Sequence, residues 1–138
     1  MESHSVYDND VHVVTNVIKG FIRDGLPPKM EPLCPYDKYD EFIKAPTIED
    51  KDVRLARLQD LVWSLPSVNR VTLKFLCEHL FKVAENREVN KMSIQNLSII
   101  FAPNILRSAD NSLAREMLDM NAKCAVMMTL IEYVKWIF

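Results

Sequence analysis

The sequence predicts an all-α protein, a compact helical bundle. Apolar residues recur three and four positions apart along several segments, which is the period of an amphipathic α-helix. Prolines and polar clusters separate these segments, and both end helices. No segment alternates apolar and polar residues between hairpin turns, so no β-strand is indicated. We expect a tail over residues 1–9 and one helical domain over residues 10–138.

The first predicted helix covers residues 10–24, with Asp10 as its N-cap. Its apolar residues at helical spacing are Val13, Val14, Val17, Ile18 and Phe21. Gly25 and the prolines that follow it end the helix, and a loop reaches to about Tyr36. A short helix over residues 37–44 follows and stops before Pro46.

Two longer amphipathic helices come next. One covers residues 49–65 and is halted by Pro66, and Ser67 is predicted to cap the other. The apolar side of this other helix consists of Leu73, Leu76, Cys77, Leu80, Phe81 and Ala84. Residues 86–90 form a polar turn after it.

The remaining segments are predicted to be helical as well. Ser93 begins a helix that should end at Pro103. A polar loop over residues 108–112 leads to a brief helix through Met117, and Asn121 opens the last helix. The apolar stripe of that last helix consists of Ala125, Met128, Ile131 and Val134, with most of its faces buried.

Composition excludes several classes of function. The formal charge of -2 is not the excess of positive charge that nucleic acids or anionic membranes attract. No apolar run is long enough to span a bilayer, so we expect a cytoplasmic protein. The two glycines, Gly20 and Gly25, form no phosphate-binding loop. The cysteines and histidines lie far apart, so no metal site and no cofactor are predicted.

Few residues indicate chemistry by themselves. Acidic residues at the start of the helix over residues 49–65 are typical of favourable helix-dipole interactions. The methionines Met117, Met120, Met127 and Met128 are typical of core filler. Lys19 and Arg23 are four residues apart and so share one helix face, which is usual for solvated cations. Asn104 follows Pro103, a common pair in turns.

Several ordered motifs, however, resemble the GTPase-activating domain of Rho regulators (RhoGAP). Residues 10–14 read Asp-Val-His-Val-Val, similar to the family's Asp-Val-His-x-Val, and residues 17–24 resemble its Leu-Leu-Lys-x-Tyr-Leu-Arg-Glu. Leu65-Pro66 with Asn69 resembles Leu-Pro-x-x-Asn. Residues 90–92 read Asn-Lys-Met as in the family, and residues 101–106 resemble Phe-Gly-Pro-Asn-Leu-Leu. The resemblance covers nearly all of residues 10–138.

The resemblance implies a helical bundle whose concave face binds the switch regions of a Rho- or Rac-like small GTPase in its GTP-bound state. It implies that Lys19 and Arg23 line this face and that Asn104 forms hydrogen bonds near the nucleotide. The partner, and not this chain, would hold the GTP. The protein is thus expected to be a regulator of another protein's GTP hydrolysis.

One departure from the family bears on activity. The family's arginine finger lies in a Gly-Ile-Phe-Arg-x-x-Gly loop upstream of the Asp-Val-His helix, whereas no arginine precedes Arg23 here. We therefore expect a RhoGAP domain without its first helices, which binds a GTPase with weak or absent activation and has no catalytic residue. Apolar surface uncovered in this way would favour self-association.

Two alternatives remain. The chain is an activator whose finger belongs to a longer parent chain or to a partner, or it is a helical scaffold that binds no GTPase.

Overall fold

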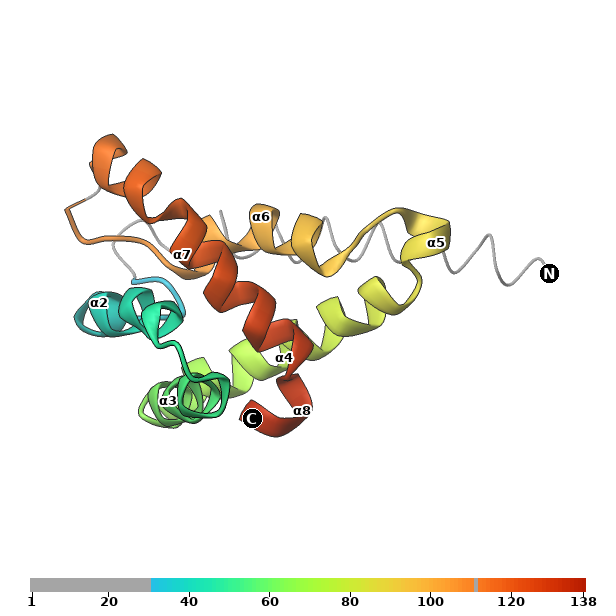
Figure 1. Ribbon diagram of the computed structural model, residues 1–138, viewed down its shortest axis with the longest axis horizontal. Helices are drawn as coiled ribbons and strands as arrows, with labels where there is room; N and C mark the ends of the chain where they lie inside the picture. Colours follow the sequence, from blue (N-terminus) through green and yellow to red (C-terminus); the bar gives the residue numbers. More distant parts are fainter. Residues whose placement is uncertain (1–30, 111) are drawn as a thin grey trace.

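The computed structural model describes residues 31–110 and 112–138, and it is all-helical there, as predicted (Figure 1). The elements, in chain order, are α2 (Tyr36–Lys44), the 3-10 helix η2 (Ala45–Thr47), α3 (Lys51–Trp63), α4 (Ser67–Glu85), α5 (Arg87–Asn90), α6 (Ile94–Ile105), α7 (Leu113–Glu132) and α8 (Val134–Ile137). The helix predicted over residues 10–24 lies outside the described residues.

The core lies where α7 crosses the other helices. α7 packs most extensively on α6 and also contacts α2, α4 and α8, as its diagonal course in Figure 1 shows. Its contribution to the core consists of Val126, Met127, Leu130 and Ile131, all without solvent exposure. The predicted apolar stripe included Ala125 and Met128, but both are only partly buried. Their neighbours Val126 and Met127 are the residues that enter the core.

The predicted helix start at Ser93 is confirmed, whereas α3 begins at Lys51, two residues after the predicted residue 49, with Asp50 as its N-cap. The side chain of Asp50 accepts a hydrogen bond from the Val53 backbone N–H at the start of α3. The Ser93 hydroxyl accepts one from the Asn96 N–H at the start of α6. Each side chain satisfies a backbone donor that has no partner inside the helix.

The predictions for Ser67 and Pro103 were wrong. Ser67 is the first residue of α4, and Pro66 occupies the N-cap position without a side-chain cap. α6 continues through Pro103 to Ile105, and the Leu106 N–H still donates to the Ala102 carbonyl at 2.9 Å. Proline removes one helical hydrogen bond, but its φ fits a helix, so a proline near the last turn is tolerated here.

The two helices predicted on either side of Asn121 are one helix, α7. No glycine or proline lies within it, and Asn121 is exposed, so its side chain does not disrupt the helix. The polar turn predicted over residues 86–90 contains the short helix α5. The isolated parallel bridge between Cys34 and Leu106 is the only strand-like pairing within residues 31–110 and 112–138.

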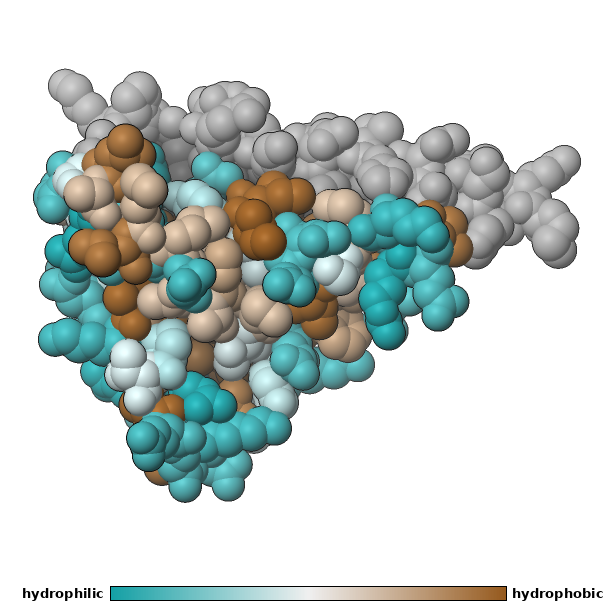
Figure 2. All heavy atoms as spheres, turned by 45° about the horizontal axis from the view of Figure 1, so that its top comes forward, coloured by the Kyte–Doolittle hydropathy of each residue, from teal (hydrophilic) through white to brown (hydrophobic). Residues whose placement is uncertain are grey.

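The methionines of α7 do not all fill the core. Met127 is fully buried, but Met117 is 71% exposed. Hydrophobic side chains gather over the start of α7 in Figure 2, where Leu113 and Leu118 are exposed as well. The core-filler interpretation therefore fails for Met117. Throughout the described part of the chain, each helix is too short or too polar to cross a lipid bilayer.

Candidate functional site

The C-terminal end of α6 holds the segment over residues 101–106. Its fully buried members are Phe101, Ala102, Ile105 and Leu106. The Cys34 backbone N–H donates to the Ile105 carbonyl at 3.2 Å, which fastens the segment to the chain ahead of α2. The apolar residues therefore anchor this end of α6, while Pro103 and Asn104 between them stay partly exposed.

The side chain of Asn104 makes one hydrogen bond within the described residues. Its side-chain Nδ2 donates to the Ile100 carbonyl at 3.3 Å, one turn earlier in α6. This bond orients the amide, and its Oδ1 accepts no hydrogen bond from the part of the chain that is described. An amide oxygen can accept up to two hydrogen bonds. Lys19 and Arg23 lie in residues 1–30, outside the described structure, and their place beside Asn104 stays a prediction.

The loop after α6 is held by α7. The Ser108 backbone N–H donates to Glu116 Oε1 at 3.3 Å. The other carboxylate oxygen of Glu116 accepts from Lys123 Nζ, and the Lys123 side chain is fully buried. Because a buried charge requires a partner, this ion pair fixes the Glu116 carboxylate and, through it, the loop that begins two residues after Asn104.

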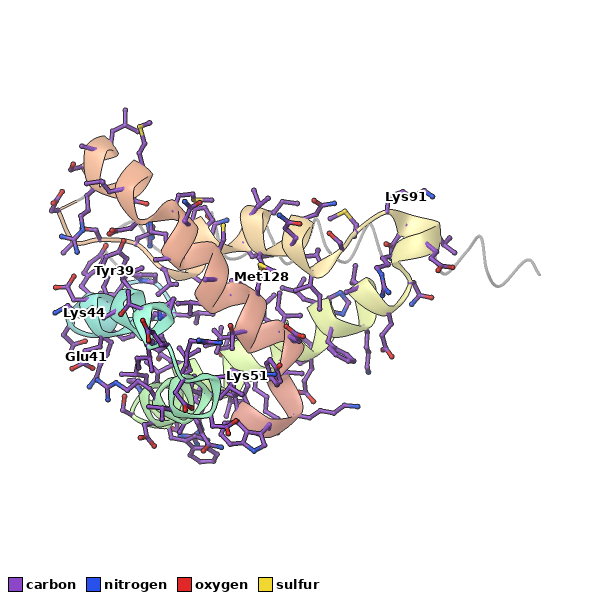
Figure 3. All side chains as sticks on the ribbon, in the orientation of Figure 1. Tyr39, Glu41, Lys44, Lys51, Lys91 and Met128 are labelled. Carbon is purple, nitrogen blue, oxygen red and sulfur yellow. The ribbon has the colours of Figure 1, made fainter. Side chains whose placement is uncertain are left out.

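A second polar cluster joins α2 to α7. Tyr39, which lies on α2 beside α7 in Figure 3, donates its hydroxyl to Asp119 Oδ2 at 2.7 Å. Arg115 Nε donates to the same oxygen at 2.7 Å, and Arg115 Nη2 donates to Asp40 Oδ1 at 2.5 Å. The guanidinium group also lies 5.4 Å from the centre of the Tyr39 ring. These contacts orient the first turns of α7 relative to α2.

The electrostatics of this cluster keep Asp119 ionised. Burial opposes the charge of Asp119, but the hydrogen bonds from Tyr39 and Arg115 outweigh it and lower the pKa of the carboxyl below its ordinary value. Burial and the bond to Asp119 raise the pKa of the Tyr39 phenol. The bonds to Asp119 and Asp40 raise the pKa of Arg115. The cluster has the properties of a structural ion-pair network.

Other motif asparagines have structural roles. Asn69 Nδ2 donates to the Leu33 carbonyl at 3.0 Å and ties the first turns of α4 to the segment before α2. Asn90 is buried, where its Nδ2 donates to the Val83 carbonyl and its Oδ1 accepts from the Met92 N–H. Asn90 therefore connects the end of α4 to the start of α6.

Among the described residues we find neither a metal-binding group nor a reactive thiol. Over residues 31–110 and 112–138, no three His, Cys, Asp or Glu side chains form a group that could hold a metal ion. Cys34 and Cys77 are buried free thiols, and burial raises the pKa of both. Thiols in this state are poor nucleophiles.

Two features of this site could not be predicted from the sequence. The i,i+4 pair Arg115 and Asp119 was visible as a helix ion pair, but nothing in the pattern indicated that Tyr39 would complete it from a distant helix. The burial of Lys123 was likewise hidden, because lysine in an amphipathic helix normally faces solvent.

Comparisons with known proteins agree with one another. Residues 1–110 match the model of the RhoGAP domain. Rho GTPase-activating protein 21 of mouse is 40% identical over 129 residues, which are 94% of this chain and 6% of that protein. The chain therefore spans only a small part of this relative.

Two solved structures have a similar fold. The human Rho GTPase activating protein 15 is 35% identical with a TM-score of 0.81, and the match covers 94% of this chain and 59% of that one. The BH domain from GRAF, the GTPase regulator associated with focal adhesion kinase, is 36% identical with a TM-score of 0.76, covering 87% of this chain and 62% of that one.

Proposed function

The chain belongs to the RhoGAP domain family, and from this premise we propose that it binds a Rho-family small GTPase in the GTP-bound state. The partner holds the nucleotide, because this sequence contains two glycines and no glycine-rich phosphate loop. The chain is then a regulator of its partner's GTP hydrolysis and has no hydrolytic site of its own.

The observation that carries this proposal is the state of Asn104. The apolar residues around it are fully buried and hold the end of α6 in place, whereas Asn104 is partly exposed with a free Oδ1 among the described residues. A preorganised amide at the surface loses little conformational entropy when it binds a partner. Lys19 and Arg23 are proposed to supply cations on the same face.

We further propose that residues 1–138 alone accelerate hydrolysis weakly or not at all. An arginine finger stabilises charge on the transferring phosphoryl group and raises the rate by about 10³ to 10⁵-fold. No arginine precedes Arg23 in this sequence, and Arg23 is assigned to the binding face. Binding without strong activation is the consequence.

A second candidate function follows from the small share of its relatives that the chain covers. It spans 6% of the mouse relative's length, so a longer chain or a partner can supply the finger. This candidate is a full activator when that segment is present.

One comparison separates these functions. GTP hydrolysis by a panel of Rho-family GTPases is measured with and without the chain, and binding is measured to their GDP-bound, GTP-bound and transition-state-mimic forms. Binding of the GTP-bound form without faster hydrolysis supports the first proposal. Near-full activation of GTP hydrolysis refutes the proposal that residues 1–138 activate weakly because they contain no arginine finger. The absence of binding to every GTPase supports the scaffold alternative.

The binding face has its own test. We expect Asn104→Ala to weaken GTPase binding by about three- to tenfold, the effect of one lost hydrogen bond. Lys19→Ala and Arg23→Ala should each weaken binding as well and make it less sensitive to salt. Gln95→Ala is the control, because Gln95 is an exposed amide near the other end of α6. If the Asn104→Ala and Gln95→Ala variants bind the GTPase with equal affinity, Asn104 does not contribute to the interface.

A further inference from the structure

Both tryptophans of the chain lie where α3 runs beside α8. Leu55, Gln59 and Trp63 are four residues apart along α3, so they share one face of that helix. Gln59 Nε2 donates to the Trp136 carbonyl at 2.9 Å, and Trp63 Nε1 donates to the Ile137 carbonyl at 3.0 Å. These bonds hold α8 along this face of α3, yet Trp63 is 53% exposed and Trp136 is 50% exposed.

A hollow of about 400 Å³ lies between the start of α3, whose Lys51 is labelled in Figure 3, and the start of α8. Its lining combines two aromatic rings, an aliphatic side chain and two charged side chains, and consists of Lys51, Asp52, Leu55, Tyr133 and Trp136. We name this hollow, together with Trp63 farther along α3, the α3–α8 groove. Hollows of this size lined by aromatic groups are typical of binding sites.

Two of the aromatic rings in the α3–α8 groove are held in place. The Arg70 guanidinium group lies 4.3 Å from the centre of the Trp63 ring, and the Lys51 ammonium group lies 5.2 Å from the centre of the Tyr133 ring. Cations over aromatic rings attract them electrostatically. Side chains that are already ordered lose little conformational entropy when a partner covers them.

The charges at the hollow favour a cationic ligand. The hydrogen bond to Tyr133 and the carboxylates of Glu132 and Asp52 raise the pKa of Lys51, so these groups lie close to its ammonium. Two carboxylates therefore outnumber the one ammonium group at this end of the α3–α8 groove. A ligand that carries a positive charge complements this surface, whereas an anionic membrane does not.

The shape and chemistry of the groove fit an extended, proline-rich segment. Such segments form polyproline II helices, whose proline rings pack on aromatic side chains and whose backbone carbonyls have no internal hydrogen bonds. The indole N–H of Trp136 is a donor suited to such a carbonyl. Leu55 and Trp63 are eight residues apart, or about 12 Å along α3. A polyproline II helix covers this length with about four residues.

We propose that the α3–α8 groove binds a proline-rich segment of another protein, with a basic residue of that segment beside Asp52. α8 packs on α3, α4 and α7, and in Figure 1 α3 and α8 lie at the bottom of the molecule with α6 above them. The groove is therefore a surface separate from Asn104. This inference does not depend on the proposed binding of a GTPase.

The first test compares three synthetic peptides by fluorescence anisotropy. Each has a fluorescent label and a core of six identical residues: prolines between two arginines, prolines between two glutamates, or alanines between two arginines. We expect the arginine-flanked proline peptide to bind at least threefold more tightly than the glutamate-flanked one, because of the charges at the hollow. It should bind at least tenfold more tightly than the alanine peptide, which forms no stable polyproline II helix.

The second test uses matched variants with the arginine-flanked proline peptide. We expect Trp136→Ala to weaken binding by at least tenfold, while Phe75→Ala, which removes an aromatic ring that is 67% exposed on α4, stays within about twofold. Asp52→Asn should weaken binding by about threefold, the effect of one exposed ion pair. Asp60→Asn is its control, because Asp60 is an exposed carboxylate of α3 that does not line the hollow. Circular dichroism checks that each variant is folded.

The proposal is overturned if the proline peptides bind no more tightly than the alanine peptide. It is also overturned if Trp136→Ala weakens binding no more than Phe75→Ala, or Asp52→Asn no more than Asp60→Asn. If light scattering shows a dimer that Trp136→Ala dissociates, the groove holds a second copy and the proposal is wrong. Loss of GTPase binding leaves the proposal standing, since the peptide tests use no GTPase.

Discussion

At the scale of single residues, one carboxylate shows how burial and hydrogen bonding compete. Asp119 accepts hydrogen bonds from the Tyr39 hydroxyl and from Arg115 Nε, each at 2.7 Å. Burial alone would favour the neutral acid, but the two donors favour the ion and lower its pKa. The ionised carboxylate therefore joins α2 and α7 more strongly than the neutral acid would.

This balance predicts acid sensitivity. The pKa of Asp119 is lower in the folded protein than the ordinary value of about 3.9. Its contribution to the free energy of unfolding is thus fully present above about pH 4 and is lost as the pH falls through the lower folded pKa. We expect Asp119→Asn to be less stable than the wild type at pH 7, with the difference narrowing below about pH 4.

Urea unfolding at pH 7 and at several acidic pH values measures this difference. The control is Asp60→Asn, which changes an exposed carboxylate on α3. If the difference in free energy of unfolding between the wild type and Asp119→Asn does not change with pH, the prediction of a lowered Asp119 pKa is contradicted.

At the scale of elements, side-chain caps decide where several helices begin. Asp50, Ser93 and Ser112 each accept a hydrogen bond from a backbone N–H in the first turn of α3, α6 and α7. α4 begins differently, since Pro66 occupies its N-cap position. Proline cannot cap with a side chain, but its extended ψ of 144° turns the chain into the helix. A serine beside a helix start is therefore not enough to make a cap.

Ser93 and Ser67 form a matched pair for testing this difference. We expect Ser93→Ala to lower the free energy of unfolding by about 1 kcal/mol, since it removes the acceptor for the Asn96 N–H. Ser67→Ala should change it by less than about 0.5 kcal/mol, because Ser67 provides no cap. Urea unfolding of both variants measures the two values. Similar losses would mean that both serines stabilise their helices equally.

At the scale of the whole molecule, α7 connects the core to the candidate site. Its C-terminal half supplies core residues, while its first turns contact α2 and the loop after α6. Lys123 lies between these halves with no solvent exposure, binds Glu116, and lies 5.6 Å from the centre of the Tyr39 ring. Loss of this lysine should thus affect both stability and the position of the loop.

We expect Lys123→Met to lower the free energy of unfolding by about 3 kcal/mol, because Glu116 would keep its charge without its buried partner. Adding Glu116→Gln to this variant should restore part of the loss, since the unpaired charge is then removed. Chemical denaturation of the wild type and the two variants measures both changes. A double variant no more stable than Lys123→Met would show that the loss has another cause.

Local signals in the sequence were enough for most of the secondary structure. Pro66 and Ser93 act on their own backbone neighbours, so their effects on helix boundaries follow from the nearby sequence. Pro103 was misread because its effect depends on position, and near the last turn of α6 the loss of one hydrogen bond is tolerated. Asn121 was misread as a helix start because its exposure on α7 was not known.

The sequence by itself determined the all-α class, most helix boundaries in the described residues and the motifs that indicate the family. These depend on the helical period and on residues a few positions apart. Only the tertiary structure decided which polar groups meet, namely Tyr39 with Asp119, and which apolar residues stay uncovered, namely Met117 beside Pro103. Such contacts join residues far apart in the chain, and their proximity follows from the packing of α7 against α2 and α6.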